Sequence, residues 1–286
     1  MSDKFTEAVN FILSNLGYER EGNTLRLKRF ERLKGLIGEG LVLELSRRLT
    51  SGWHVRPHGP VYIVRQSTYL DSRRRYRDRE VPEGTGFATM RLELCDHSGT
   101  HLDALNHVSD MGKVFPGVSI GEVREDIDGF KPMDITVLPP LITRGVLFHV
   151  PKKEVEEVTV EDLKRSLGGE RVERGDAALI YTGWNEYAEE EPGLGLEGAK
   201  WLADLGVAVI GNDSPRSEFI SRKSKDFFPV HRFLIAQRGI PLIDNMYLEE
   251  LDRVLLKEGR RDFLLIVLPL RIEGATASPV NPVAML

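Results

Sequence analysis

The N-terminal segment has the hydrophobic pattern of an amphipathic helix. Between residues 4 and 16, apolar side chains recur at intervals of three and four positions, which predicts a helix with one apolar face. That face consists of Phe5, Ala8, Val9, Ile12, Leu13 and Leu16. We expect it to pack on the body of the protein or on a partner.

Two segments alternate between apolar and polar positions, as half-buried strands do. The first covers residues 41–45, where we expect the central sheet to begin. The second covers residues 87–95 and places Met90, Leu92 and Leu94 on one face. This second strand leads directly into a group of histidines.

Four further apolar runs have the length and composition of interior strands, and helical patterns lie between them. The predicted strands are 145–150, 176–182, 207–210 and 263–270, and the predicted helices are 159–167 and 196–205. Alternating strands and helices predict an α/β fold. Because no repeat or clear linker interrupts the pattern, we expect one domain over residues 41–286, preceded by an N-terminal helical extension over residues 1–40.

Composition narrows the class of partner. The 286 residues are 41% hydrophobic and 29% charged, as in an ordinary globular protein, and the net charge is −5. A negative chain is a poor match for nucleic acid or an anionic membrane, so we expect a small-molecule partner. The single cysteine, Cys95, excludes an intramolecular disulfide, and the first 20 residues hold no apolar run of signal-peptide length. We therefore expect a cytoplasmic protein.

Three histidines and an aspartate crowd one short segment. Seven histidines spread over 286 residues would place fewer than one in any window of 11, yet residues 97–107 contain His97, His101 and His107, with Asp103 among them. Imidazole and carboxylate groups are ligands for zinc, manganese or iron, and a carboxylate can bridge two ions. The alternative, in which the histidines only cap turns, is more plausible for one of them than for all.

The spacing in this segment suits a metal site. If residues 100–104 are extended, His101 and Asp103 point the same way, and a turn at Ser98 and Gly99 folds His97 back toward them. His107 would then lie beside the ion without ligating it, where a histidine can transfer protons.

A second candidate group is His231 and Asp244. The sequence around them predicts a short helix, a turn at Gly239 and a strand that ends at Asp244, which is a usual position for a ligand. Taken one at a time, both residues are more often structural. His54, His58 and His149 are isolated in the sequence, and we expect His149 to be a satisfied core or edge residue.

The first histidine segment resembles the H-x-G-T-H-x-D-x-x-x-H signature of the putative cyclase family, which includes bacterial kynurenine formamidase and isatin hydrolase. The segments GDAALIYTGW, VAVIGNDSP and EGATASPVNPVAM are similar to later parts of the family pattern, and the first forty residues are not covered. The resemblance implies a mixed central sheet of the swivelling β/β/α type and a homo-oligomer, dimer or tetramer.

By position, the resemblance also implies roles for the candidate residues. It implies one or two Zn²⁺ or Mn²⁺ ions, the first held by His97, His101 and Asp103, and the second by Asp103, His231 and Asp244. His107 falls on the catalytic histidine. The chain departs from formamidase-type members at Leu105, where they commonly have proline, and at Asp244, where they have glutamate.

The leading hypothesis is therefore a metal-dependent hydrolase of an amide, lactam or ester. A metal-bound water of lowered pKa would supply hydroxide, and His107 would serve as general acid and base. Alternatives are a metal-assisted cyclase or dehydratase with His107 as base, and a metal- or ligand-binding protein without turnover. A nucleophilic triad is disfavoured because Cys95 shows no evident activation.

The sequence leaves the substrate open. Aromatic side chains that could line a flat pocket are Trp184, Tyr187, Phe227 and Phe228. Arg216 or the arginine-rich run at residues 73–79 could bind a carboxylate, although such a run is usually a solvated loop.

Overall fold

A nine-stranded mixed sheet organises the molecule. The computed structural model describes residues 3–21, 24–53, 58–76, 78–79, 82–126, 129–152, 156–184, 191–220 and 226–286. The strand order is β18-β6-β16-β15-β13-β11-β17-β19-β3, and the sheet curls strongly into a half-barrel. The strands are β3 (Val42–Glu44), β6 (His101–Asp103), β11 (Leu141–His149), β13 (Ala177–Tyr181), β15 (Val209–Asn212), β16 (Leu242–Asp244), β17 (Asp262–Val267), β18 (Ala277–Pro279) and β19 (Val283–Met285).

The centre of the sheet is parallel and its margins are antiparallel. Strands β11, β13, β15 and β16 run parallel to one another, whereas β6, β17, β18, β19 and β3 pair antiparallel. All four predicted interior runs contribute strands to this sheet, and most side chains of these strands are buried. The run at 263–270 leaves the sheet after Val267, and its Leu268 and Leu270 are exposed. The predictions of an α/β fold, a single domain and a mixed sheet are thereby confirmed.

Helices connect the strands where the pattern predicts them. The predicted helices are α4 (Val160–Leu167) and α5 (Leu196–Leu205), and a further helix, α7 (Glu249–Glu258), precedes β17. Thr159 caps α4 in a capping box with Asp162. Short elements complete this part of the fold: β12 (Glu157–Val158), β14 (Gly193–Leu194), α6 (Pro229–His231) and a π-helix at Arg232–Gln237.

The N-terminal segment packs into the same core. The predicted helix is α1 (Asp3–Asn15), and Ala8, Val9, Ile12 and Leu13 of its apolar face are buried among the core residues. The face therefore packs on the body. The extension is not wholly helical as predicted, because a hairpin of β1 (Tyr18–Glu21) and β2 (Thr24–Leu27) lies between α1 and the short helix α2 (Phe30–Lys34). β2 alternates polar and apolar residues, but three of the four residues of β1 are charged, so the sequence carries no clear strand pattern there.

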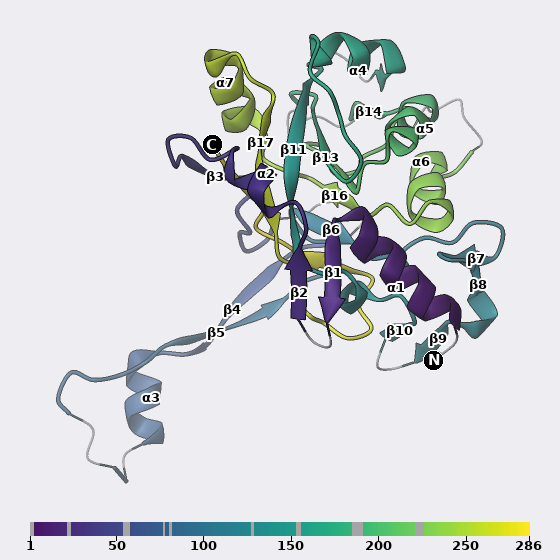
Figure 1. Ribbon diagram of the computed structural model, residues 1–286. Helices are drawn as coiled ribbons and strands as arrows, with labels where there is room; N and C mark the ends of the chain where they lie inside the picture. The colour runs from purple at the N-terminus through teal and green to yellow at the C-terminus, as the bar shows by residue number, and fades with distance from the viewer. Residues whose placement is uncertain are drawn as a thin grey trace.

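A hairpin with a helix at its tip projects from the body (Figure 1). It consists of β4 (Tyr62–Ser67), α3 (Tyr69–Arg75) and β5 (Thr89–Glu93), and we call these three elements the arm. The predicted strand at residues 87–95 is thus present, but half-burial of its apolar face is wrong. Met90 is 52% exposed and Leu92 61%, because β5 pairs only with β4 and the body covers neither of its faces.

The remaining elements lie between β6 and β11. They are β7 (Lys113–Val114), β8 (Val118–Ser119), a 3₁₀ turn at Ile120–Glu122, β9 (Arg124–Asp126), β10 (Gly129–Lys131) and a 3₁₀ turn at Ile135–Val137. Across the described part of the chain, no helix has the length and apolar character that a membrane span requires.

Candidate metal centre

Strand β6 places two of the predicted ligands on one face of the sheet. It lies between β18 and β16, and all three of its residues are buried. His101 and Asp103 are two positions apart in an extended strand, so their side chains point to the same side, as predicted. Asp244, the last residue of β16, lies directly opposite His101 in the antiparallel ladder and shares this face.

A tight turn returns His97 to the same place. Gly99 has φ +71°, a left-handed conformation that glycine adopts without strain, and a side chain there would displace the tip of Leu49. The carbonyl oxygen of Gly99 lies 2.9 Å from Nδ1 of His101, which leaves Nε2 of that ring facing the cluster. The predicted turn at Ser98 and Gly99 is therefore present.

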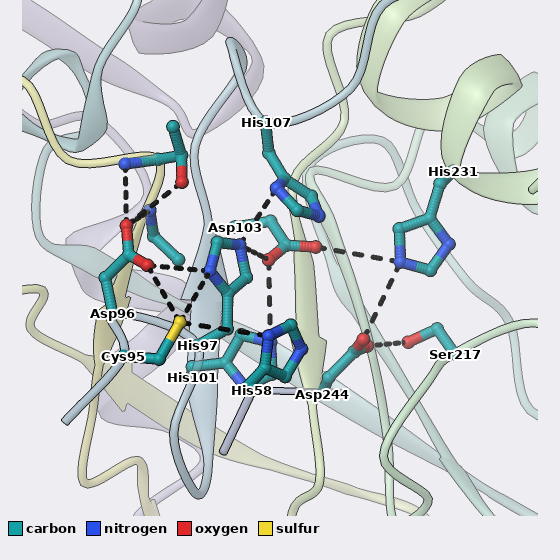
Figure 2. Close-up of polar contacts among 12 residues, drawn as sticks. His58, Cys95, Asp96, His97, His101, Asp103, His107, Ser217, His231 and Asp244 are labelled. Carbon is teal, nitrogen blue, oxygen red and sulfur yellow. Dashed lines mark hydrogen bonds and ion pairs between the residues drawn. The ribbon is translucent and has the colours of Figure 1, made fainter. Parts of the chain in front are cut away.

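Asp103 lies at the centre of the cluster (Figure 2). Its Oδ1 is 3.5 Å from His97 Nε2 and 3.6 Å from His101 Nε2, whereas its Oδ2 is 3.8 Å from His231 Nε2. Both carboxylate oxygens are buried and have no hydrogen-bond partner among the described residues. A buried carboxylate without donors is costly unless a cation compensates it, so this donor set fits a metal ion.

His231 and Asp244 close the other side of the cluster. His231 ends α6, and its Nε2 lies 3.7 Å from Oδ2 of Asp244. One potential ligand atom from each of Asp103, His231 and Asp244 lies within 4.8 Å of the other two. The predicted short helix, the turn at Gly239 and the strand ending at Asp244 are all present and bring these residues together.

Two residues that the sequence analysis missed hold this side in place. The carboxylate of Glu218 is fully buried, lies 2.7 Å from Nδ1 of His231 and accepts a hydrogen bond from the backbone N–H of Val230 at 2.8 Å. Ser217 Oγ donates to Oδ1 of Asp244. A carboxylate on the distal nitrogen of a ligating histidine fixes its tautomer and orientation. The sequence gives no local signal for either contact.

His107 lies beside the cluster, at the end of a single turn. The backbone N–H of His107 donates to the backbone carbonyl of Ala104. The ring Nδ1 of His107 is 2.9 Å from Nε2 of His97. Ligand atoms of His97, Asp103 and His107 also lie within 4.8 Å of one another. The structure therefore brings His107 together with all five predicted metal ligands.

Asp96 and His58 contact His97 on the side away from Asp103. Asp96 Oδ1 lies 2.8 Å from Nδ1 of His97, while its Oδ2 accepts from the backbone N–H of Thr276 at 2.9 Å. The His58 ring stacks on the His97 ring, with centroids 5.1 Å apart and an angle of 16°. The interpretation of His58 as isolated is thus wrong, since this residue joins the cluster from a distant part of the sequence.

The remaining histidines lie elsewhere. His149, near the end of the parallel sheet region, pairs with Asp252 at 2.8 Å, which matches the expected satisfied edge position. His54 lies outside the described residues.

Burial keeps two of the imidazoles neutral. It lowers the pKa of His101 to about 4. It also lowers the pKa of His107 well below its usual value, and the nearby charges of His97 and His231 act in the same direction. A neutral His107 can accept a proton at neutral pH.

Carboxylates have the opposite effect on the other two imidazoles. Burial alone would lower their pKa values, but the contacts of His97 with Asp96, and of His231 with Asp244 and Glu218, raise the pKa of each histidine to about 10. Both rings therefore carry protons that a metal ion would displace on binding.

The two carboxylates of the cluster differ as well. Burial, helped by the charge of Asp244, raises the pKa of Asp103. For Asp244, burial acts in the same direction but the hydrogen bonds with His231 and Ser217 outweigh it, so its pKa is lowered.

The surroundings of Cys95 favour the thiolate form, which the sequence does not indicate. Hydrogen bonds from His58 and then His97 lower the pKa of the Cys95 thiol to about 6, against the effect of burial. It lies beyond the end of β5, at the foot of the arm, not within a strand.

Of the residues that the sequence suggests for substrate binding, some lie near the cluster and others do not. Phe228 packs edge-on against His231, with ring centroids 5.1 Å apart, and its neighbour Phe227 is largely exposed. Arg47 stacks over the ring of Trp184. Arg216 pairs with the half-buried Glu191, which neutralises its charge. Tyr187 lies outside the described residues.

The arginine-rich run at residues 73–79 starts on the arm, and residue 77 lies outside the described residues. It begins within α3, at the tip of the arm and away from the cluster (Figure 1). The structure also contains a cavity of about 600 Å³, lined by residues that include Phe5, Lys131 and Arg271, and no residue of the cluster lines it. Neither feature therefore lies at the candidate metal centre of this chain.

Comparison with known proteins finds a matching family model and similar proteins. The family model described as "Putative cyclase" matches residues 41–218. A kynurenine formamidase from Delftia acidovorans is 32% identical over 198 residues, which are 67% of this chain and 77% of that protein.

Two solved structures share the fold. A structure described as a novel cyclase superposes with a TM-score of 0.80 at 22% identity and covers 98% of this chain and 95% of its own. Isatin hydrolase A from Labrenzia aggregata superposes with a TM-score of 0.64 at 16% identity and covers 88% of this chain and 95% of its own.

Proposed function

Because the chain belongs to the putative cyclase family, we propose that it is a metal-dependent hydrolase that cleaves an amide, lactam or ester carbonyl. The observation that carries the proposal is Asp103, a buried carboxylate whose two unpaired oxygens face different histidines. The likeness to kynurenine formamidase favours a carbon–nitrogen bond outside a peptide as the bond that is cleaved.

Two sets of residues would hold the ions. His97, His101 and Asp103 would bind the first Zn²⁺ or Mn²⁺, and Asp103, His231 and Asp244 would bind a second. When bound, such an ion lowers the pKa of water and polarises a carbonyl oxygen. Imidazole and carboxylate ligands accept either metal, so the ligand set leaves its identity open between these two.

His107 would move the proton. Its lowered pKa leaves the ring neutral, so it would take the proton of the attacking water and pass it to the leaving nitrogen or oxygen. Its Nδ1 faces His97 at 2.9 Å, which positions the ring beside the ligands. Acid–base help of this kind contributes about 10²- to 10⁴-fold to the rate.

The substrate would be a small carbonyl compound. Phe228 against His231 supplies an aromatic surface at the cluster, which suits a flat aromatic amide. N-formyl aromatic amines, isatins and simple lactams are the compounds to test first.

Metal analysis and one variant test the proposal. Purified protein should contain one or two transition ions per chain by elemental analysis and should hydrolyse at least one compound of these three classes. His107→Asn should lower kcat by about 10²-fold or more while the ion remains bound. His149→Asn, which alters a histidine outside the cluster, is the matched control and should retain activity.

Two outcomes would contradict the proposal. One is protein that holds no ion and cannot be reconstituted with Zn²⁺ or Mn²⁺. The other is a His107→Asn variant that turns over as fast as the unaltered protein.

We also propose that the chain forms a homodimer or larger homo-oligomer and that the arm lies between copies. Apolar side chains are exposed on both β4 and β5, and an isolated two-stranded ribbon needs further packing for stability. Residues 62–93 contain seven arginines and five acidic residues, whereas the whole chain has a net charge of −5. A positive arm therefore matches the negative body of a second copy.

A further inference from the structure

A second group of metal-ligating atoms adjoins the candidate metal centre. His58, Cys95 and His97 each offer one such atom, and these atoms lie within 4.8 Å of one another. The Nε2 edge of His97 faces Asp103, whereas its Nδ1 edge faces Cys95 and Asp96 (Figure 2). The group is therefore on the opposite edge of the same ring.

The distances are close to those of a coordinated ion. Cys95 Sγ lies 3.8 Å from Nδ1 of His58 and 4.0 Å from Nδ1 of His97. A tetrahedral ion with metal–sulfur and metal–nitrogen bonds of about 2.3 and 2.0 Å separates sulfur from nitrogen by about 3.5 Å. Shifts of about 0.3 to 0.5 Å, within the reach of side-chain rotation, would bring both sulfur–nitrogen distances to this value.

Asp96 could supply a fourth ligand. Asp96 Oδ1 lies 3.4 Å from the Cys95 sulfur and 2.8 Å from Nδ1 of His97. Its other oxygen is held by the N–H and hydroxyl of Thr276 and the N–H of Ala277, so the carboxylate is fixed in position. A metal ion would replace the proton that joins Asp96 to His97.

We propose that His58, Cys95, Asp96 and His97 form a second kind of metal site, selective for thiophilic or borderline divalent ions such as Zn²⁺, Co²⁺ and Cd²⁺. A thiolate with two imidazoles prefers these ions, whereas Mn²⁺ prefers oxygen ligands. The proposal concerns binding and does not depend on hydrolase activity. We call this group the thiolate site.

The two sites share His97, and this has a consequence for metal binding. A neutral imidazole has one nitrogen lone pair to donate, so His97 can ligate through Nε2 or through Nδ1 but not through both. An ion at the thiolate site should therefore weaken binding at the first position of the candidate metal centre. Mn²⁺ bound beside Asp103 should in turn weaken binding at the thiolate site.

Cobalt absorption tests the thiolate site directly. Metal-depleted protein is titrated with CoCl₂, and the thiolate-to-cobalt charge-transfer band in the near ultraviolet is followed. Cys95 is the only cysteine in the chain, so any such band reports on this residue. We expect a band that saturates at one thiolate-bound ion per chain and disappears in Cys95→Ser.

Three variants separate the thiolate site from the candidate metal centre. His58→Ala should weaken the affinity that the band reports by more than about 100-fold, beyond the loss typical of an outer-shell contact. His231→Ala, which removes a ligand of the other site, and His149→Ala, outside both, should keep the band. Circular dichroism confirms that Cys95→Ser and His58→Ala are folded.

The proposal is overturned if unaltered protein shows no band, or if His58→Ala binds Co²⁺ as tightly as unaltered protein. The shared role of His97 is overturned if saturating Mn²⁺ leaves the cobalt affinity of the thiolate site unchanged. Because the readout needs no turnover, a protein without hydrolase activity could still pass this test, and an active hydrolase could still fail it.

Discussion

Strands β5 and β6 follow one another in the chain, yet their surroundings are opposite. Every residue of β5 is exposed, because β4 is its only neighbour in the sheet. Every residue of β6 is buried, because β16 and β18 flank it and the core packs around it. Alternation of apolar and polar residues thus specifies a strand but does not specify what covers its faces.

The difference also separates two kinds of chemistry. On β6 both oxygens of the buried Asp103 carboxylate lack a hydrogen-bond donor among the described residues, which suits the metal-ligating role proposed for it. On β5 the exposed apolar side chains suit the contact with a second copy that we propose. Changes on β6 should therefore act on ions and turnover, and changes on β5 on assembly.

The largest effect is expected for His101→Ala on β6. Loss of this ligand should remove the first ion and lower turnover by about 10³-fold or more, because the ion supplies several kcal/mol of transition-state stabilisation. The fold should survive, since a core of this size does not depend on a metal. Elemental analysis, an activity assay and thermal unfolding measure the three quantities. If the variant is unfolded, the site is structural and its proposed role is wrong.

Asp244→Asn tests the partner strand of β6. If Asp244 ligates, the variant should lose the second ion while the first remains, with the affinity at that position reduced by more than about 100-fold. Metal titration measures the stoichiometry, and Asp252→Asn, a buried aspartate outside the cluster, is the control. Unchanged stoichiometry would mean that Asp244 only orients His231, with which it makes a polar contact.

The sequence predicts the metal cluster well where its ligands are local. His97, His101, Asp103 and His107 occupy one segment, so strand and turn rules suffice to converge them. His58 cannot be predicted in this way. It lies 37 positions before Cys95, on the other side of the arm, and only the return of the chain through β4 and β5 brings the two together.

The interior strands and the helices can be predicted because their patterns are also local in the sequence. Continuous apolar runs such as Ala177–Tyr181 report burial on both faces, and β13 is covered on both faces. Two features could not be predicted in this way: the exposure of β5 and the presence of the β1–β2 hairpin. Both depend on contacts between distant residues, or on the absence of such contacts. A single sequence contains no local record of those contacts.

Polar substitutions on β5 should affect assembly alone. Met90→Ser with Leu92→Ser removes two exposed apolar side chains from one face of the arm, and we expect the oligomer to weaken by about 2 kcal/mol, or about 30-fold in Kd. Light scattering at micromolar concentration measures the shift. Leu268→Ser with Leu270→Ser, on exposed residues outside the arm, is the matched control. A monomeric unaltered protein would refute the proposed role of the arm.

Acid should weaken the body through Asp162. Burial would raise its pKa, but the contacts with Lys152 and Thr159 outweigh this effect and lower the pKa from 3.8 to about 2. A lowered folded-state pKa stabilises the protein above the unfolded value, and this contribution is lost as the pH falls from about 4 to 2. Asp162→Asn should therefore cost about 2 kcal/mol at pH 7 and much less near pH 2. Urea unfolding at pH 7 and pH 3 measures the difference, and an equal loss at both would exclude the ionised carboxylate as the cause.

The smallest expected effect concerns the capping box, a motif that occurs both in the body and in the arm. Thr159 caps α4 in the body and Thr68 caps α3 in the arm, and each forms a capping box with an aspartate three positions later. Removing such a cap typically costs about 1 kcal/mol of helix stability. Thr159→Ala should lower the global free energy of unfolding by this amount, because α4 packs against β11 and α5 in the core. Thr68→Ala should leave global unfolding unchanged and increase only amide hydrogen exchange within α3, because the arm opens locally. Equal losses in global stability would show that the arm and the body unfold as one cooperative unit, and the contrast between β5 and β6 would then be one of exposure but not of stability.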